Sequence, residues 1–200
     1  MKIYDISKEL FSAEVYPGDP RPDRERVLET SKGNDCNLSV LTMGSHNGTH
    51  MDAPYHFVES GRTVEQIGLE QVVGVCDVIE VSGIVNSQIL EKCLPKDCER
   101  LILKGDFTLD VEGASFLAKR KIILFGLEAM TVAEGEAGLA IHRILLGADM
   151  VILESLVMEG VPEGRYILCA APLKLKGLDG APCRPFLLKM DEQQGVPGKG

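Results

Sequence analysis

The chain has 200 residues, of which 44% are hydrophobic and 26% are charged, as in an ordinary globular protein. Its formal net charge of -9 argues against binding to nucleic acid or to anionic membranes, because both need a basic surface. The first residues include no apolar signal core and no long apolar run follows, so we expect a cytoplasmic protein. The six cysteines form no Cys-x-x-Cys pair, and we expect free thiols.

Strand and helix patterns are mixed along the chain. We expect strands at 38–43, 75–81, 101–104, 121–125, 151–154 and 166–171, and helices at 63–72, 87–93, 111–120 and 136–146. Thr63 stands three residues before Gln66 as a capping box, Asp110 can cap the third helix, and Gly147 can end the fourth. These patterns predict one mixed α/β domain over residues 1–200, with a loose Gly/Pro-rich tail at 193–200.

The segment 45–56 contains three of the four histidines in the chain. It is a poor helix former and follows an expected strand, so we interpret it as extended. Because side chains alternate along an extended chain, His46, His50 and Asp52 would share one face. Gly48 would lie between them and leave space for an ion. Imidazole and carboxylate groups suit a divalent cation such as zinc or manganese.

Three further residues could belong to the same site. Pro54 would end the extended segment and turn His56 back over the ion. His142 lies on the helix expected at 136–146, and Glu154 ends the apolar strand expected at 151–154. A lone histidine is usually a hydrogen-bonded core residue, and a carboxylate at a strand end is usually exposed. Spacing alone therefore leaves both the structural and the metal-binding interpretation of His142 and Glu154 open.

One pattern in this segment resembles the signature of the cyclase-like metal hydrolases, a family that includes bacterial kynurenine formamidases and isatin hydrolases. The pattern is His46-x-Gly48-Thr49-His50-x-Asp52-x-Pro54-x-His56. Four further stretches resemble other parts of the family: Tyr16-Pro17-Gly18-Asp19, Phe125-Gly126-Leu127-Glu128, Gly160-Val161-Pro162 and Pro172 to Arg184. The resemblance thus extends over nearly the whole chain.

The resemblance implies five metal ligands, namely His46, His50, Asp52, His142 and Glu154. The first three would bind one ion and the last three a second, with Asp52 as a bridge. His56 would be the catalytic proton donor and acceptor. The implied fold is a compact α/β domain of the swivelling β/β/α type, with a central, partly barrel-like mixed sheet flanked by helices. The implied assembly is a homodimer or homotetramer.

This ligand set predicts hydrolysis of a small-molecule amide with the help of one or two divalent ions, zinc or manganese. A bound ion lowers the pKa of water to about 7, and the resulting hydroxide would attack the carbonyl carbon. His56 would pass a proton to the leaving nitrogen. Two alternatives stay open. One is a non-haem iron oxygenase with His50, Asp52 and His142 as a facial triad, and the other is a non-catalytic module that binds a metal or small ligand.

Two departures from the family's formamidases concern the substrate. Tyr16 stands where those enzymes usually carry Trp, and the segment 104–121 is shorter than its counterpart. The ring of Tyr16 would line the substrate pocket, or it would only pack its turn against the core. If it lines the pocket, we expect a planar substrate, either an aryl formamide such as N-formylkynurenine or a cyclic amide, with weaker selectivity than in a dedicated formamidase.

Overall fold

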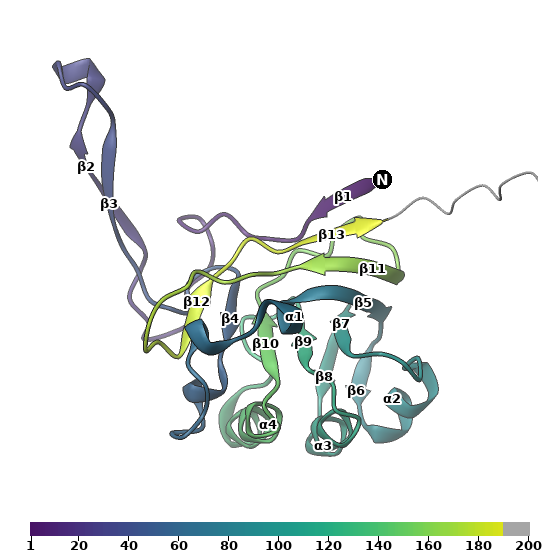
Figure 1. Ribbon diagram of the computed structural model, residues 1–200. Helices are drawn as coiled ribbons and strands as arrows, with labels where there is room; N and C mark the ends of the chain where they lie inside the picture. Colours follow the sequence, from purple (N-terminus) through teal and green to yellow (C-terminus); the bar gives the residue numbers. More distant parts are fainter. Residues whose placement is uncertain (190–200) are drawn as a thin grey trace, which may run out of the picture.

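The computed structural model describes residues 1–189, which are built around a curled nine-stranded sheet (Figure 1). The strand order in this sheet is β1-β13-β11-β5-β7-β9-β10-β4-β12. Its strands are β1 (Lys2–Asp5), β4 (His50–Asp52), β5 (Val73–Glu80), β7 (Arg100–Lys104), β9 (Leu124–Gly126), β10 (Val151–Glu154), β11 (Gly164–Cys169), β12 (Gly180–Pro182) and β13 (Phe186–Lys189).

The remaining elements are short strands and helices around this sheet. The other strands are β2 (Asp23–Leu28), β3 (Leu38–Thr42), β6 (Gly83–Val85) and β8 (Phe107–Leu109). The α-helices are α1 (Leu69–Val72), α2 (Ser87–Cys93), α3 (Val111–Lys119) and α4 (Gly135–Gly147). Three single-turn 3₁₀ helices lie at Thr30–Lys32, Pro54–His56 and Val64–Gln66.

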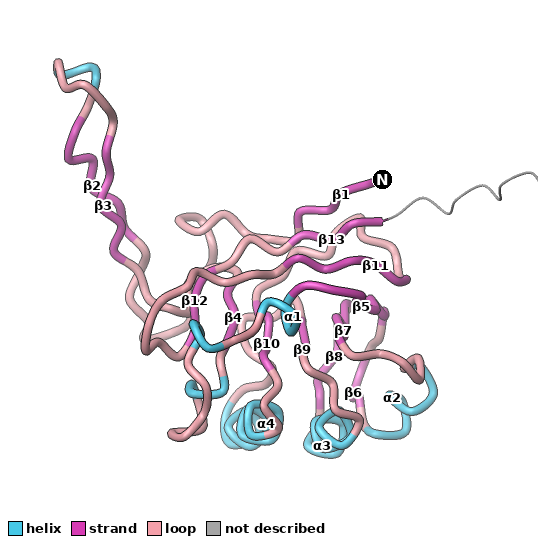
Figure 2. Tube along the Cα trace, viewed as in Figure 1, coloured by secondary structure: helices cyan, strands magenta, loops and turns pink. Residues whose placement is uncertain are grey.

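The sheet is parallel at its centre and antiparallel toward both edges. Strands β5, β7, β9 and β10 run parallel, and the chain between them passes through α2, α3 and α4. These helices cover one face of the sheet, while β11, β13 and β1 curl over the other (Figures 1 and 2). Because the middle of these strands is buried on both faces, its residues are largely apolar, as in Leu101-Ile102-Leu103 of β7.

The expected fold class, a mixed α/β unit with a partly barrel-like sheet flanked by helices, is confirmed. Helices α2 and α3 begin at the expected residues, and the side chain of Asp110 accepts a hydrogen bond from Gly113 N (2.7 Å) as a cap. Helix α4 and strands β5, β7, β10 and β11 lie within two residues of their expected starts. That all of 1–200 forms one domain stays a prediction, and the tail expected at 193–200 lies outside the described residues.

Two expectations about local structure need correction. The helix expected at 63–72 is two separate turns, although the capping box is present and Thr63 N donates to Gln66 Oε1 (3.0 Å). The strand expected at 121–125 begins only at Leu124, because Lys121 has a positive φ of 57° and its turn interrupts the extended chain. The strand expected at 38–43 is confirmed as β3, and it pairs with β2 in a hairpin that the sequence did not predict.

This hairpin projects from the body of the molecule (Figure 1). Almost every residue of both strands is exposed, including apolar side chains on β3: Leu38, Val40 and Leu41. Within residues 1–189, no helix is long and apolar enough to cross a membrane.

Candidate metal centre

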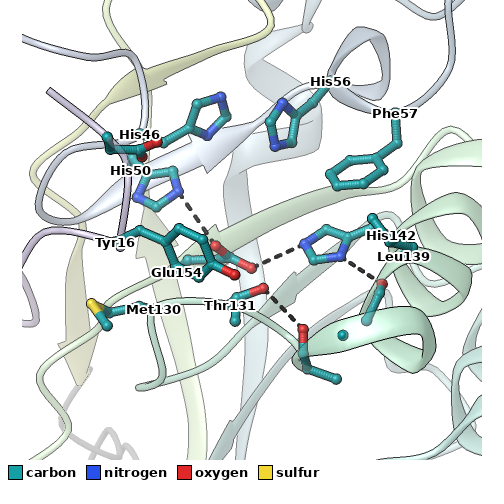
Figure 3. A pocket seen from close by; sticks show the side chains of 14 residues that line it. Tyr16, His46, His50, His56, Phe57, Met130, Thr131, Leu139, His142 and Glu154 are labelled. Carbon is teal, nitrogen blue, oxygen red and sulfur yellow. Dashed lines mark hydrogen bonds and ion pairs between the residues drawn. The ribbon is translucent and has the colours of Figure 1, made fainter.

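The site is built around β4, which lies between β10 and β12 in the sheet. His50 and Asp52 are the first and last residues of this strand and are both buried. Glu154 ends β10 directly opposite His50, so the sheet register itself brings the carboxylate to the histidine. His142 comes from α4, which packs against β10, and its imidazole points toward Glu154 (Figure 3).

The extended interpretation of residues 46–52 holds only for His50–Asp52. His46 lies in a turn before the strand, and Gly48 in this turn has a φ of +64°. A Cβ atom on Gly48 would lie 3.3 Å from Leu10 Cδ1, so this glycine faces the N-terminal segment and does not leave space for an ion. The turn, rather than strand alternation, brings His46 back to Asp52.

A different glycine makes room at the site. A Cβ atom on Gly180 would lie 2.7 Å from His46 Cε1, a distance that real Cβ atoms essentially never show. Gly180 pairs with Asp52 in the sheet, so β12 and the imidazole of His46 approach closely at this point. The sequence alone did not indicate a function for Gly180.

The imidazoles of His50 and His142 both face the same two carboxylates. His50 Nε2 lies 3.4 Å from Asp52 Oδ1 and 3.4 Å from Glu154 Oε2. His142 Nε2 lies 3.5 Å from Glu154 Oε1 and 3.9 Å from Asp52 Oδ2. Each of these four residues is at least 95% buried. Two carboxylates therefore lie together in a space that water reaches poorly.

Backbone carbonyls determine which nitrogen of each imidazole is free. His50 Nδ1 donates to Gly48 O (2.9 Å), and His142 Nδ1 donates to Gly138 O (2.8 Å). Since neutral imidazole carries one N–H, this leaves a lone pair on each Nε2. A lone pair that faces a carboxylate at such distances is favourable only if a proton or a cation lies between them. Metal-binding histidines are usually fixed by such a hydrogen bond on the second nitrogen.

The polar atoms of Asp52 give the clearest sign that this site can hold a cation. Asp52 Oδ2 is buried and has no hydrogen-bond partner among the described residues. Burial would raise the pKa of this carboxyl, but His46 and His50 outweigh burial and hold it well below its usual range. Burial would likewise lower the pKa of His50, while Asp52 and Glu154 raise it to about 10. The two buried carboxylates therefore favour positive charge at this centre.

The five expected ligands therefore converge, and their chemistry fits a divalent ion. The nitrogen and oxygen donors include no sulfur, and two groups of three can reach a common point: His50, Asp52 and Glu154, and His46, Asp52 and His56. Asp52 belongs to both groups. Its Oδ1 faces His46 and His50, and its Oδ2 faces His142, which is the arrangement a bridging carboxylate needs.

Asp179 is a site residue that sequence reasoning missed. Its Oδ2 lies 2.8 Å from His46 Nε2 and 3.0 Å from His56 Nδ1. These hydrogen bonds lower the pKa of Asp179 well below its usual range, and the bond from Asp179 helps to raise the pKa of His46 to about 9 against the effect of burial. The only signal was its place in the family-like stretch from Pro172 to Arg184, and no spacing links it to the histidines.

A cavity of about 310 Å³ opens onto the centre. His56, which the 3₁₀ turn Pro54–His56 directs toward the site, lines it together with His46, His50, His142 and Glu154. The other walls are largely apolar side chains, namely Tyr16, Phe57, Met130 and Leu139 (Figure 3). Tyr16 is 44% exposed, and its role as a wall of the substrate pocket stays a prediction. The ring of Phe57 stacks on His142 with a centroid distance of 4.4 Å.

Known proteins share both the sequence and this architecture. The family model described as "Putative cyclase" matches residues 4–102. The kynurenine formamidase of Erythrobacter litoralis (strain HTCC2594) is 33% identical over 207 residues, which cover 96% of this chain and 95% of the relative. A solved structure of a potential metal-dependent hydrolase with cyclase activity has a TM-score of 0.80 at 31% identity and covers 93% of this chain and 96% of that one.

Isatin hydrolase A from Labrenzia aggregata shares the fold, with a TM-score of 0.79 at 23% identity over 93% of both chains. The identity to the formamidase extends over nearly the whole chain, and the five converging side chains lie on a fold shared with a potential metal-dependent hydrolase. This chain therefore belongs to the cyclase family.

Proposed function

We propose that the protein is a metal-dependent amidohydrolase that cleaves the carbon–nitrogen bond of an aryl formamide or a cyclic amide. The observation that carries this proposal is the pair of buried carboxylates, Asp52 and Glu154, which face imidazole nitrogens and, within residues 1–189, pair with no Lys or Arg. A pair of buried carboxylates without compensating charge would be too costly to keep. The relatives named above support an amide as the substrate.

The residues of this chain divide into those that hold an ion and those that act on the substrate. When bound, a divalent ion lowers the pKa of a water molecule to about 7 and polarises the substrate carbonyl. The proposed holders are His46, His50, Asp52, His142 and Glu154. His56 stands beside them at the cavity, where it can take a proton and return it to the leaving nitrogen.

The metal identity and the number of ions belong to the same proposal. A set of imidazole and carboxylate donors favours zinc or manganese over calcium and magnesium, which are bound almost entirely by oxygen. The two oxygens of Asp52 face different imidazoles, which supports up to two ions with Asp52 as their bridge. One ion would use the side of His46 and His50, and the second the side of His142 and Glu154.

The cavity walls support a planar substrate. Tyr16, Phe57 and Leu139 supply an apolar and aromatic lining, against which an aryl ring can pack. A cavity of about 310 Å³ is at the lower end of the range for small-molecule sites, which suits N-formylkynurenine, a simple formanilide or isatin.

Neither alternative accounts for all of these residues. An oxygenase triad of His50, Asp52 and His142 would leave the buried carboxylate of Glu154 without a function. A binding module would have no use for His56, a titratable side chain at the cavity beside the ligands. Both alternatives are therefore weaker than hydrolysis.

The proposed assembly is a homodimer or homotetramer in the cytoplasm. The exposed apolar side chains of the β2–β3 hairpin support association with another copy. All six cysteines have free thiols, which suits a reducing compartment.

The test removes the metal from purified protein and then adds back zinc or manganese. We expect the depleted protein to be inactive and the reloaded protein to release formate from aryl formamides or to open cyclic amides. Elemental analysis should give one to two ions per chain. A protein that takes up neither metal, or that is loaded but consumes oxygen and hydrolyses no amide, would contradict the proposal.

A further inference from the structure

The structure assigns to Asp179 the role of a positioning residue that sets which nitrogen of His56 and of His46 carries the proton. This inference rests on the proposed role of His56 as the proton carrier. The key feature is that a single oxygen, Asp179 Oδ2, lies within hydrogen-bond distance of both imidazoles.

Asp179 is itself held firmly at this position. Its backbone carbonyl accepts a hydrogen bond from Ala53 N (2.9 Å), which follows β4 directly. The hydroxyl of Ser45 donates to Asp179 Oδ1 (3.1 Å), so the carboxylate cannot turn freely. The close approach of Gly180 to His46 brings this part of the chain against the imidazole. The carboxylate thus has a fixed orientation before any ligand binds.

The consequence for His56 follows from what a carboxylate can do. An ionised carboxylate only accepts hydrogen bonds, so the His56 Nδ1 at 3.0 Å must carry the proton. In the neutral ring, Nε2 then has the lone pair. No described residue makes a hydrogen bond to this Nε2, and His56 lines the cavity. The free lone pair is therefore available to a proton of the attacking water.

The same argument applies to His46. Its Nε2, at 2.8 Å from Asp179, must carry the proton, and its Nδ1 is directed at Asp52 (2.8 Å). The lone pair of His46 is thereby placed on the side of the proposed ion. The rings of His46 and His56 stack with centroids 4.0 Å apart, so one carboxylate can fix the orientation of both rings.

The proton balance of hydrolysis gives Asp179 a second effect. One O–H bond of the attacking water breaks as oxygen bonds to the carbonyl carbon, and its proton moves to His56 Nε2. The resulting imidazolium keeps its Nδ1–H on Asp179, whose negative charge stabilises it. The carbon–nitrogen bond then breaks as the proton passes from Nε2 to the leaving nitrogen, and His56 is neutral again.

The experiment compares Asp179→Ala with Asp179→Asn in zinc-loaded protein. Alanine removes the acceptor, whereas asparagine keeps one acceptor oxygen and removes only the charge. Asp106→Ala is the matched control, because Asp106 is an exposed carboxylate outside the site. The readouts are the ¹⁵N shifts of the imidazoles, which report the tautomer without any turnover, and zinc content, kcat and KM.

We expect Asp179→Ala to lose the single His56 tautomer and to lower kcat about 100- to 1,000-fold with KM changed by less than about 5-fold. Its zinc affinity should fall about 10- to 100-fold, as when a hydrogen-bond partner of a ligand is removed. Asp179→Asn should keep the tautomer and recover part of kcat, and the control should resemble the wild type.

Two results would overturn the inference. One is a His56 tautomer in Asp179→Ala that is the same as in the wild type. The other is complete loss of zinc in both Asp179 variants, as expected for Asp52→Ala, which would make Asp179 a ligand. Because the tautomer is measured without substrate, it decides the inference even if the chain hydrolyses no amide. Conversely, a correct tautomer with no amidase activity would count against the proposed function alone.

Discussion

Asp52 has two oxygens that face different imidazoles, and one of them has no hydrogen-bond partner among the described residues. Asp52→Ala should therefore lower metal content more than removal of any single histidine, because it removes ligands from both sides of the centre. Elemental analysis after dialysis against a fixed zinc concentration measures this. Full metal content in Asp52→Ala, with loss in His50→Ala, would show that Asp52 is not the bridge.

His56 is the one histidine whose contacts suggest proton transfer rather than metal binding, although its nitrogen also lies within reach of His46 and Asp52. His56→Ala should keep most of the metal and lose about 10²- to 10⁴-fold in kcat, the usual size of general acid–base catalysis. Metal analysis and steady-state kinetics on the same preparation separate the two roles. If this variant loses its metal as completely as His50→Ala, His56 is a ligand.

Tyr16 presents its half-exposed ring to the cavity, where it can stack against a planar substrate. Tyr16→Ala should lower kcat/KM for aryl formamides by about 10-fold or more, since a stacked aromatic pair and its buried area contribute on the order of 1–2 kcal/mol. Aliphatic amides should be affected little. Preference of the wild type for aliphatic amides, unchanged in Tyr16→Ala, would remove Tyr16 from substrate binding.

How far the site could be predicted depends on whether its residues are close in sequence. The clustering of His46, His50 and Asp52 indicated a metal, and the structure places them together. The prediction that Gly48 leaves space for an ion was wrong. The direction in which a glycine faces depends on the turn it occupies, and the sequence around Gly48 did not show this turn. Asp179 could not be found from spacing, since only the pairing of β12 with β4 brings it beside His46.

Among the elements, the β2–β3 hairpin lacks support from the body of the protein. An isolated two-stranded hairpin is marginally stable in water, and this one exposes Leu38, Val40 and Leu41 at 50–57%. We therefore expect it to pack against another copy of the chain. Replacing these three residues by Thr keeps the strand propensity but removes apolar surface, and should shift light-scattering masses from dimer or tetramer toward monomer.

The control for the hairpin is Ile84→Thr, which removes an apolar side chain that is 66% exposed on β6. This change should leave the mass in solution as it is in the wild type. Equal masses for the hairpin variant and the wild type would show that the assembly uses another surface.

Helices and buried strands were easier to predict than this hairpin. Helix α3 combines an Asp cap with a clear apolar face, and β10 is a run of buried aliphatic residues. In β2, by contrast, Asp23, Arg24, Glu25 and Arg26 form a charged run with no alternation, because neither face of the hairpin packs against the core. Strand β3 is equally exposed but is rich in Leu and Val, so the sequence predicted it, whereas the charged run of β2 gave no such pattern.

At the scale of the molecule, the proposed ion would connect β4, β10, α4 and the turn that holds His46. Zinc at about 1,000 times its Kd should stabilise the folded state by about 4 kcal/mol, because only that state brings the ligands together. For a chain of this size, this corresponds to a rise of about 8–16 °C in Tm. Calorimetry with zinc and with a chelator measures it. Asp52→Ala should show little of this rise, and an equal Tm in both conditions for the wild type would contradict it.

The position of β4 between β10 and β12 also has a consequence for the order of events during synthesis. His50 and Asp52 leave the ribosome before the strands on either side of them, which contain Glu154 and Gly180. Until those strands have been made, a nascent chain can present isolated histidines and an unpaired strand. Metal loading must wait until β10 has been made, so a ribosome stalled before β10 should display a chain that retains no zinc.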